Sequence, residues 1–251
     1  MRIIQLAAAS LCLALLSWHD AEAQSFWETS AHQDFRDAMK SYDNSMFSWS
    51  RTSFDGLADG SVSSDAEAFS VLSQARSNAP GYAEAMDAFI AGNPHSVHIP
   101  QIRWHHAMNL FDSHDYRAAG KALESIEMKR LHKSQHVEYL FRKAYCDLEN
   151  RDLDSAQSNF IQVEKSSVQD YSAPARYALG YISYVQRDFR NALSWFEKSR
   201  KDARFAQMSA YYIMECRFML GDHDYVAENG DSVYETVPQD RKPHLARIIS
   251  E

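Results

Sequence analysis

Residues 179–199 read LGYISYVQRDFRNALSWFEKS, and this stretch decides the fold. Gly180 and Ala192 are small residues on either side of a turn that contains Asp188. Asp is a favoured helix N-cap, so Asp188 predicts the start of a second helix. Phe196 follows Ala192 by one helical turn and therefore lies on the same face. The stretch predicts two antiparallel helices that approach closely at their small residues.

The same turn occurs five times along the chain. Its copies are Pro80-Gly81-Tyr82-Ala83-Glu84-Ala85, His114-Asp115-Tyr116-Arg117-Ala118-Ala119, Arg151-Asp152-Leu153-Asp154-Ser155-Ala156, Arg187-Asp188-Phe189-Arg190-Asn191-Ala192 and His223-Asp224-Tyr225-Val226-Ala227-Glu228. Their last residues are 34, 37, 36 and 36 positions apart. Small residues recur twelve positions upstream, at Ser73, Ala107, Ala144, Gly180 and Cys216. Large apolar residues recur four positions downstream, at Phe89, Leu123, Phe160 and Phe196, whereas the last copy departs with Glu228 and Ser232. A fixed period of this length predicts stacked helical repeats.

This pattern resembles the tetratricopeptide repeat family over about residues 65–240, and Leu179-Gly180, Asp188-Phe189, Ala192, Phe196 and Ser199 form the best copy. The resemblance implies an all-α fold, a right-handed α-solenoid of antiparallel helix pairs, with four to five pairs over residues 64–241. More narrowly, Tyr145-Cys146-Asp147-Leu148 and Tyr211-Tyr212-Ile213 resemble segments of long periplasmic tetratricopeptide proteins of Bacteroidota, some of which are likened to the Tol–Pal coordinator. The family pattern is specific for fold and nearly silent on function.

The N-terminus predicts a secretory signal peptide over residues 1–23. Arg2 precedes an apolar run over residues 3–16, and small residues stand at −3 and −1 of a cut after Ala23. The alternative of a membrane anchor needs about 20 apolar residues. A lipoprotein site at Cys12 is disfavoured by the bulky Leu11 before it. We therefore expect an exported chain without stable membrane insertion after cleavage, and the family resemblance implies the periplasm.

The charge balance argues against a nucleic-acid partner, and we expect none. The whole chain has 26 basic and 34 acidic residues, a net charge of −8. Removing residues 1–23 takes away Arg2, Asp20 and Glu22, which leaves 25 basic and 32 acidic residues and a net charge of −7. Nucleic-acid binding requires a cationic surface.

The two cysteines after residue 23, Cys146 and Cys216, are predicted to be buried and unpaired. An oxidising compartment would allow a disulfide. The repeat pattern nevertheless places them on first helices two repeats apart, which is too far for the ~4.4–6.8 Å that a disulfide needs between Cα atoms.

The two ends of the chain differ from the repeats. Residues 24–63 are predicted to form an N-terminal helical cap and linker, with a helix over 30–49 and a linker over 53–63. Residues 242–251 are predicted to start a further repeat helix. Because no stop signal follows this helix, we expect the chain to be truncated at its C-terminus.

The sequence contains no motif for catalysis or metal binding. HExxH, Gly-x-Ser-x-Gly, Cys-x-x-Cys and phosphate-binding glycine loops are all missing. His132 and His136 are four residues apart, but no further ligand completes the three or four that zinc requires. Asp112, His114 and Asp115 imitate a catalytic dyad, yet they fall in a turn where Asp caps a helix. We predict no enzyme, no cofactor and no metal.

The family's geometry implies a concave groove lined by the first helices. The groove residues that it implies are Trp104, His105, Met108, Phe141, Arg142, Tyr145, Tyr177, Tyr181 and Arg217. Aromatic and Arg side chains are frequent interface anchors, and such a groove suits an extended or helical peptide. The alternative is that each aromatic residue packs between helix pairs.

These features predict an exported scaffold that binds protein or peptide partners, and they assign no oligomeric state. One alternative is a coordinator of envelope or cell-wall machinery that self-associates through residues 26–54. Another is a carbohydrate-binding module that uses exposed Trp and Tyr side chains.

Overall fold

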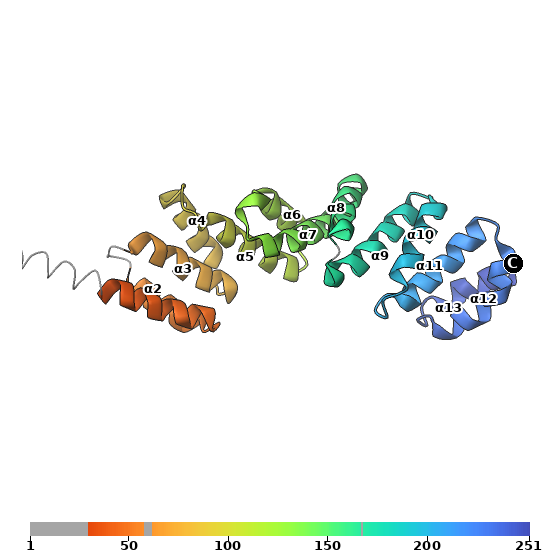
Figure 1. Cartoon of the computed structure of the whole chain (residues 1–251), viewed down its shortest axis with the longest axis horizontal. Helices are drawn as coiled ribbons and strands as arrows, with labels where there is room; N and C mark the ends of the chain where they lie inside the picture. The colour runs from red at the N-terminus through yellow and green to blue at the C-terminus, as the bar shows by residue number, and fades with distance from the viewer. Residues whose placement is uncertain (1–29, 58–61, 167) are drawn as a thin grey trace, which may run out of the picture. The chain divides into compact units, whose positions relative to one another are not determined.

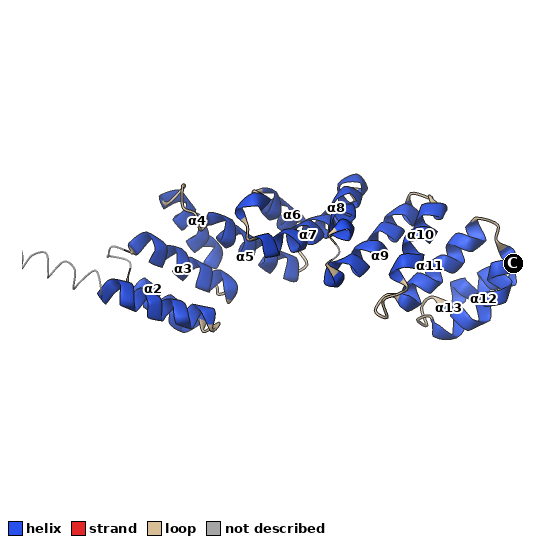
Figure 2. Ribbon diagram, in the orientation of Figure 1, coloured by secondary structure: helices blue, strands red, loops and turns tan. Residues whose placement is uncertain are grey.

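The computed structural model describes residues 30–57, 62–166 and 168–251. Every regular element in these ranges is a helix (Figure 2). Among the described helices, none combines the length and the apolar character that a membrane crossing needs. The predicted signal peptide, residues 1–23, lies outside the described residues.

Short connections join the successive helices (Figure 1). The first described helix covers residues 30–43. The α-helices that follow are α2 (Phe47–Asp55), α3 (Ser63–Arg76), α4 (Tyr82–Gly92), α5 (Ile99–Asp112), α6 (Tyr116–Glu124), α7 (His136–Glu149), α8 (Leu153–Lys165), α9 (Gln169–Val185), α10 (Phe189–Ser199), α11 (Ala206–Met219), α12 (His223–Thr236) and α13 (Lys242–Ser250). Two 3₁₀ turns, η1 (Met128–Arg130) and η2 (Lys133–Gln135), connect α6 to α7. The predicted all-α fold of consecutive helix pairs is confirmed.

One turn geometry connects the two helices of each central pair. The residue before the cap is left-handed, with φ of 63° at His114, 65° at Arg151 and 62° at Arg187. The cap then accepts a hydrogen bond from the backbone N–H three residues on: Asp115 from Ala118 at 3.0 Å, Asp152 from Ser155 at 3.1 Å and Asp188 from Asn191 at 3.2 Å. This bond satisfies one of the free N–H groups at the helix start. The three predicted capping turns are confirmed.

The predicted turn of the last pair is wrong by two residues. The N-cap of α12 is Asp222, whose carboxylate accepts from the Tyr225 N–H at 3.4 Å, and Gly221 before it has φ of 79°. The position equivalent to Ala192 is therefore Val226 and not Glu228. In this register the last interval is 34 residues, from 192 to 226.

The corrected register also explains the apparent irregularity of the last pair. We call the positions equivalent to Gly180, Ala192 and Phe196 the marker positions of a pair. In the last pair they hold Met214, Val226 and Gly230, and all three residues are buried. Glu228 and Ser232, which stand at the small and large positions in the predicted register, are exposed. Gly230 is small because its Cα faces Ile249 of α13, where an added Cβ would lie 2.7 Å from Cγ1.

The N-terminal segment is itself a helix pair. The helix predicted over residues 30–49 is wrong in its extent, because it stops at residue 43 and α2 starts at Phe47. Ser45 supplies the left-handed residue, with φ of 61°. Ala38, Ser50 and Phe54 repeat the spacing of 12 and 4 positions, and all three are buried. The segment predicted as a cap therefore has the marker residues of a further repeat.

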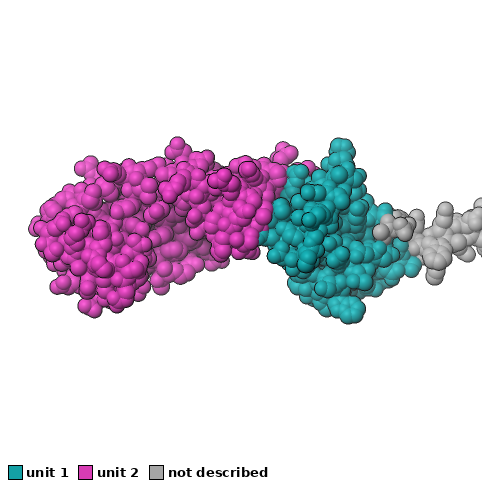
Figure 3. Space-filling model, turned by 180° about the vertical axis from the view of Figure 1, so that it is seen from behind, with its two compact units in different colours: residues 1–109 teal, residues 110–251 magenta. Residues whose placement is uncertain are grey.

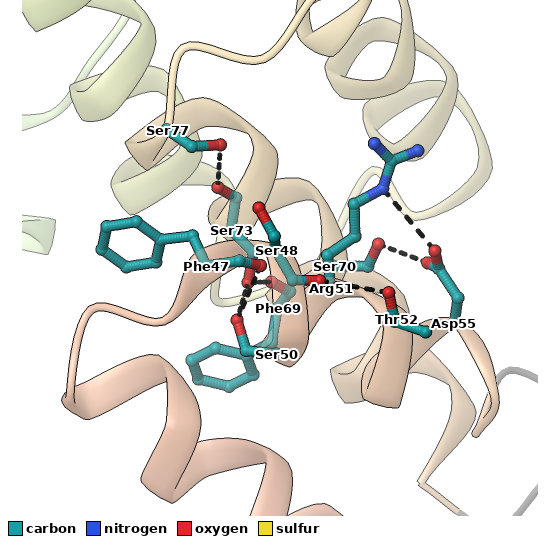
Figure 4. A network of polar contacts seen from close by, with 10 residues as sticks. All are labelled: Phe47, Ser48, Ser50, Arg51, Thr52, Asp55, Phe69, Ser70, Ser73 and Ser77. Atoms are coloured by element: carbon teal, nitrogen blue, oxygen red, sulfur yellow. Dashed lines mark hydrogen bonds and ion pairs between the residues drawn. The ribbon is translucent and has the colours of Figure 1, made fainter.

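Polar contacts attach α2 to α3 (Figure 4). The hydroxyls of Ser50 and Ser73 are 2.9 Å apart in a buried site. The Ser73 hydroxyl lies 2.7 Å from the Phe69 carbonyl oxygen, and Ser70 donates to Asp55 at 2.5 Å. Ser50 and Ser73 stand at the small marker positions of two successive pairs. A hydroxyl at each position lets the helices approach closely and satisfies both polar groups.

The chain divides into two compact units, one that ends at Asn109 and one that begins at Leu110 (Figure 3). The core of the first unit includes Ala38, Phe54, Val71, Leu72, Phe89 and Ile102. The core of the second unit is formed by two clusters, one around Phe160, Leu179 and Ile182 and one around Phe196, Tyr212, Met214 and Leu245. In both units the large marker residues Phe54, Phe89, Phe160 and Phe196 are among the most deeply buried side chains.

Candidate binding pocket

The second unit contains a pocket of about 410 Å³ on the face formed by α7, α9 and α11. Its lining residues are Phe141, Tyr145, Leu148, Glu149, Phe160, Pro174, Tyr177, Ala178, Tyr181, Phe205 and Tyr212. A volume of this size falls within the usual range for small-ligand sites, about 300–1,000 Å³. The lining is mostly aromatic, and Glu149 is its one charged residue.

Helical spacing brings these side chains to one face. Phe141, Tyr145 and Glu149 are successive residues four apart on α7, and Tyr177 and Tyr181 are four apart on α9. Residues four apart on a helix are neighbours on its surface. Because α7 and α9 are the first helices of neighbouring pairs and contact each other, their two rows together form one wall of the pocket.

Ring contacts hold the other side of the pocket in place. Tyr177 stacks on Phe205 with ring centroids 5.3 Å apart, and it meets Tyr212 edge-on at 6.2 Å. Tyr212 in turn stacks on the buried Phe196 at 4.9 Å with an interplanar angle of 7°. These separations are typical of favourable aromatic pairs. The lining is therefore anchored to the core of the second unit before any ligand arrives.

Three tyrosine hydroxyls of the pocket, those of Tyr145, Tyr177 and Tyr212, remain protonated at neutral pH. Burial, followed by the neighbouring Glu149 carboxylate, raises the pKa of Tyr145 to about 12. Burial is also the main cause that raises the pKa of Tyr177 and of Tyr212. All three hydroxyls can donate hydrogen bonds, and they add no negative charge. The formal charge of the lining at pH 7 is that of Glu149.

Four of the nine groove residues implied by the sequence come together in this pocket: Phe141, Tyr145, Tyr177 and Tyr181. Tyr181 is the most open of them, with 38% of its surface exposed. Tyr145 also packs edge-on against Phe111 and Tyr116, at 5.5 and 5.2 Å. These aromatic residues thus combine packing with a solvent-facing edge.

Arg142 is turned away from the pocket by its own partners. Its guanidinium lies 3.2 Å from Glu138 and 3.6 Å from Asp112, and it covers the Phe111 ring at 4.4 Å. The residue is an element of packing between α5 and α7 within the second unit. It does not line the pocket.

The register predicted for the last pair puts Arg217 among the groove residues. The structure shifts that register by two residues, so this prediction is wrong. Its guanidinium pairs with Asp222 at 2.7 Å and covers the Tyr225 ring at 4.6 Å. In the corrected register the groove positions of α11 are Tyr211 and Glu215. Glu215 is buried and lies 2.8 Å from His244 of α13, so α13 occupies the groove at this pair.

The remaining three residues belong to the first unit. Trp104 is only 4% exposed, and Met108 is half-buried. Burial, followed by the nearby Arg76 charge, lowers the pKa of His105 to about 4. His105 is therefore neutral at physiological pH. In this conformation the indole of Trp104 serves packing and offers little surface to a partner.

Sequence reasoning missed Leu148, Glu149, Pro174 and Phe205. Glu149 carries a signal that was available, because it follows Tyr145 by four residues on the same helix face. Phe205 carries none, since it lies in the connection before α11, where no helical period applies. Tyr212 entered the sequence analysis only as part of the Tyr211-Tyr212-Ile213 segment.

The histidines and cysteines of the described residues do not gather into a metal-binding cluster. The described residues contain no group of three or more His, Cys, Asp and Glu side chains that could hold a metal ion. His132 caps η2, and His136 begins α7. Cys146 and Cys216 are free and buried, and burial raises the pKa of each thiol to about 12. Such thiols are poor nucleophiles.

Comparisons with known proteins identify the fold. No protein-family model matches the sequence, and no curated protein matches it either. Two solved structures are similar over 88% of this chain with a TM-score of 0.52: PilF from Pseudomonas aeruginosa, at 11% identity and 98% of its length, and a tetratricopeptide repeat protein from Parabacteroides merdae, at 12% identity and 86% of its length. At this identity the likeness concerns the fold alone. The chain has the helix-pair fold of tetratricopeptide repeat proteins.

Proposed function

We propose that this chain is a scaffold that binds protein or peptide partners in the pocket on α7, α9 and α11, without a covalent step. The observation that supports this most directly is the concentration of Tyr145, Tyr177, Tyr181 and Tyr212 around one open pocket of about 410 Å³. Tyrosine combines a large contact area with few rotatable bonds, so it loses little entropy on binding. Ring contacts to the core hold the surface ready, which reduces the cost of ordering it.

Binding to a library of random nonapeptides tests this proposal. Tyr181→Ala removes the most exposed ring of the pocket and should weaken the tightest binders by about tenfold, a cost typical of an interface anchor. Val185→Ala is the matched control, because Val185 is 46% exposed, lies one turn further along α9 and is outside the lining. Equal affinities for the two variants would refute binding in this pocket. Unchanged helicity by circular dichroism is required of both.

A second candidate function is self-association through the N-terminal pair. Trp49 on α2 is 74% exposed and Met46 beside it is 46% exposed, although both are large apolar residues. Exposed apolar surface of this kind favours contact with another protein surface. Sedimentation of the chain and of its Trp49→Ser variant tests this function. A loss of oligomer in the variant supports it, and an unchanged monomer rejects it.

We also propose that the scaffold works outside the cytoplasm and resembles the long periplasmic tetratricopeptide proteins of Bacteroidota. The basis is the signal-peptide pattern of residues 1–23 together with the Tyr145-Cys146-Asp147-Leu148 and Tyr211-Tyr212-Ile213 segments. Fractionation of cells that express the full chain tests export. A mature N-terminus at Gln24 in the exported fraction is the expected result, and an uncut chain in the cytoplasm would reject it.

A further inference from the structure

The aromatic pocket carries one negative charge that no basic side chain offsets. Glu149 is exposed at the pocket wall. In the described part of the chain, no Lys, Arg or His side chain forms an ion pair with its carboxylate. The lining contains no Lys or Arg. The one formal charge that the lining presents to a ligand group is therefore negative, and it contributes negative potential at that wall.

The faces of the lining rings add to this potential. An aromatic ring is negative at its face, and a cation within about 6 Å of the ring centroid is attracted to it. Elsewhere in the chain, basic side chains lie over the faces of aromatic rings. Arg142 covers Phe111 at 4.4 Å, Arg217 covers Tyr225 at 4.6 Å and Lys198 covers Trp195 at 4.0 Å. Among the described residues, no cation covers the rings of Tyr145, Tyr177, Tyr181 or Tyr212.

The nearby cations are each held by a carboxylate of their own. Arg204 approaches the Phe205 ring at 5.6 Å, but it binds Asp202 with two contacts, at 2.8 and 3.0 Å. Arg241, which lies close enough to Tyr177 and Tyr212 to oppose the rise in their pKa, is 3.3 Å from Asp240. These pairs leave the Glu149 charge without an internal counter-ion. Tyrosine faces and one carboxylate are the groups that recognise a cation in an apolar site.

From these observations we propose that the pocket selects the cationic side chain of a lysine or arginine in an extended peptide. This inference rests on the proposed peptide-binding function and adds the class of residue that is recognised. The alkyl stem of such a side chain would lie along Phe141 and Leu148, and its charged end would reach Glu149. A leucine side chain is shorter and uncharged, so it would gain an apolar contact alone. The part of the preference for a cation that depends on Glu149 therefore measures the electrostatic interaction.

A positional-scanning peptide library tests the selectivity with the full chain. Each pool contains acetylated, amidated nonapeptides with one fixed central residue, and its affinity is measured by fluorescence polarisation. Lys-centred and Arg-centred pools should bind about tenfold more tightly than Leu-centred or Glu-centred pools. Glu149→Gln should reduce that preference to less than about threefold. Tyr181→Phe, which keeps the ring face, should preserve it.

The matched control is Glu228→Gln, which makes the same charge change at an exposed residue of α12 outside the pocket. A preference that falls equally in Glu149→Gln and Glu228→Gln would come from the net acidity of the chain and would overturn the inference. Equal or tighter binding of Leu-centred pools would also overturn it while the peptide-binding function stands. Failure of every pool to bind would reject both the inference and the proposed function.

Discussion

Gly180→Ala should destabilise the second unit, although alanine is the better helix former. The helix propensity of alanine is favourable by about 1 kcal/mol over glycine. A Cβ at residue 180, however, would lie 2.8 Å from both Cδ1 and Cε1 of Phe196. Ordinary carbon contacts are about 3.5–4.0 Å, so the ring would have to move by roughly 1 Å. The outcome depends on whether Phe196 can yield.

The neighbours of Phe196 leave it little room. The ring is fully buried, stacks on Tyr212 at 4.9 Å and meets Tyr177 edge-on at 5.7 Å. Overpacking of such a site costs about 1–3 kcal/mol, and we expect the upper half of that range. After the helix-propensity gain is subtracted, the net loss in unfolding free energy is about 1–2 kcal/mol.

Gly120→Ala provides the comparison. Gly120 is also a buried helical glycine of the second unit, but a Cβ there would meet Cys146 Cβ at 3.4 Å. That distance is nearly an ordinary contact, so Gly120→Ala should be neutral or stabilising by up to about 1 kcal/mol. The two variants therefore make the same chemical change with opposite expected signs.

Urea unfolding followed by circular dichroism measures both variants. With a slope of about 2–3 kcal/mol per molar urea, Gly180→Ala should lower the midpoint by roughly 0.3–1 M. Slopes must stay unchanged, because helical-repeat arrays can lose two-state behaviour. A Gly180→Ala variant as stable as Gly120→Ala would refute the packing argument. Phe196→Leu should make Gly180→Ala less costly, with a coupling free energy above about 0.5 kcal/mol in a double-mutant cycle.

Three further predictions follow from buried side chains. Ala192→Leu should cost about 1–3 kcal/mol of unfolding free energy by overpacking, because Ala192 is fully buried between paired helices; an unchanged urea midpoint would reject the marker register. The folded-state pKa of His105, about 4, lies below the unfolded value of about 6.5. Its stabilisation is therefore complete above pH 6.5 and falls as the pH approaches 4, by about 2 kcal/mol at pH 5. His105→Gln should remove that part of the pH dependence in urea titrations, and identical profiles for the two proteins would contradict the assignment. Cys146 and Cys216, with thiol pKa values of about 12, should resist iodoacetamide at pH 8 in the folded chain and react in 8 M urea. Peptide mapping reports each site, and rapid labelling of either residue in the folded chain would show that the site opens.

Most of the fold could be predicted from the sequence because packing restricts the marker residues. Gly180 and Ala192 must be small where two backbones approach, and Phe196 must be large to fill the space beside them. These demands recur in every pair, so they recur in the sequence at a fixed spacing. A single sequence with repeats thus supplies several independent copies of the same physical constraint.

The two errors in the fold arose where the cap and the markers gave different signals. In the last pair, Asp222 and Asp224 are both able to cap a helix, and Tyr225 after Asp224 imitated the aromatic residue of the other turns. Gly221 decides between them, because a left-handed residue must precede the cap. In the N-terminal pair, Met46 has no capping side chain, so no capping turn marks the spacing of Ala38 and Ser50 in the sequence.

The candidate site could be predicted only in part, because its positions are not restricted in the same way. The position one residue after the small marker of the first helix is Met108, Tyr145, Tyr181 and Glu215 in successive pairs. Helical spacing indicates where these side chains emerge. It does not indicate which of them a later element covers, since that depends on side chains far away in the sequence.

Glu215 illustrates this limit and explains where the pocket ends. Its carboxylate accepts a hydrogen bond from the Tyr211 hydroxyl and lies 2.8 Å from His244, which α13 brings to this point 29 residues later. At the two preceding pairs the equivalent residues, Tyr145 and Tyr181, have no such cover and line the open pocket. At α11 the position equivalent to Tyr145 and Tyr181 is thus covered by the chain's own helix, whereas the pocket between α7 and α9 remains open. A partner bound in the proposed pocket would contact the rings of Tyr145 and Tyr181. These rings stand where, in the next pair, His244 of α13 contacts Glu215.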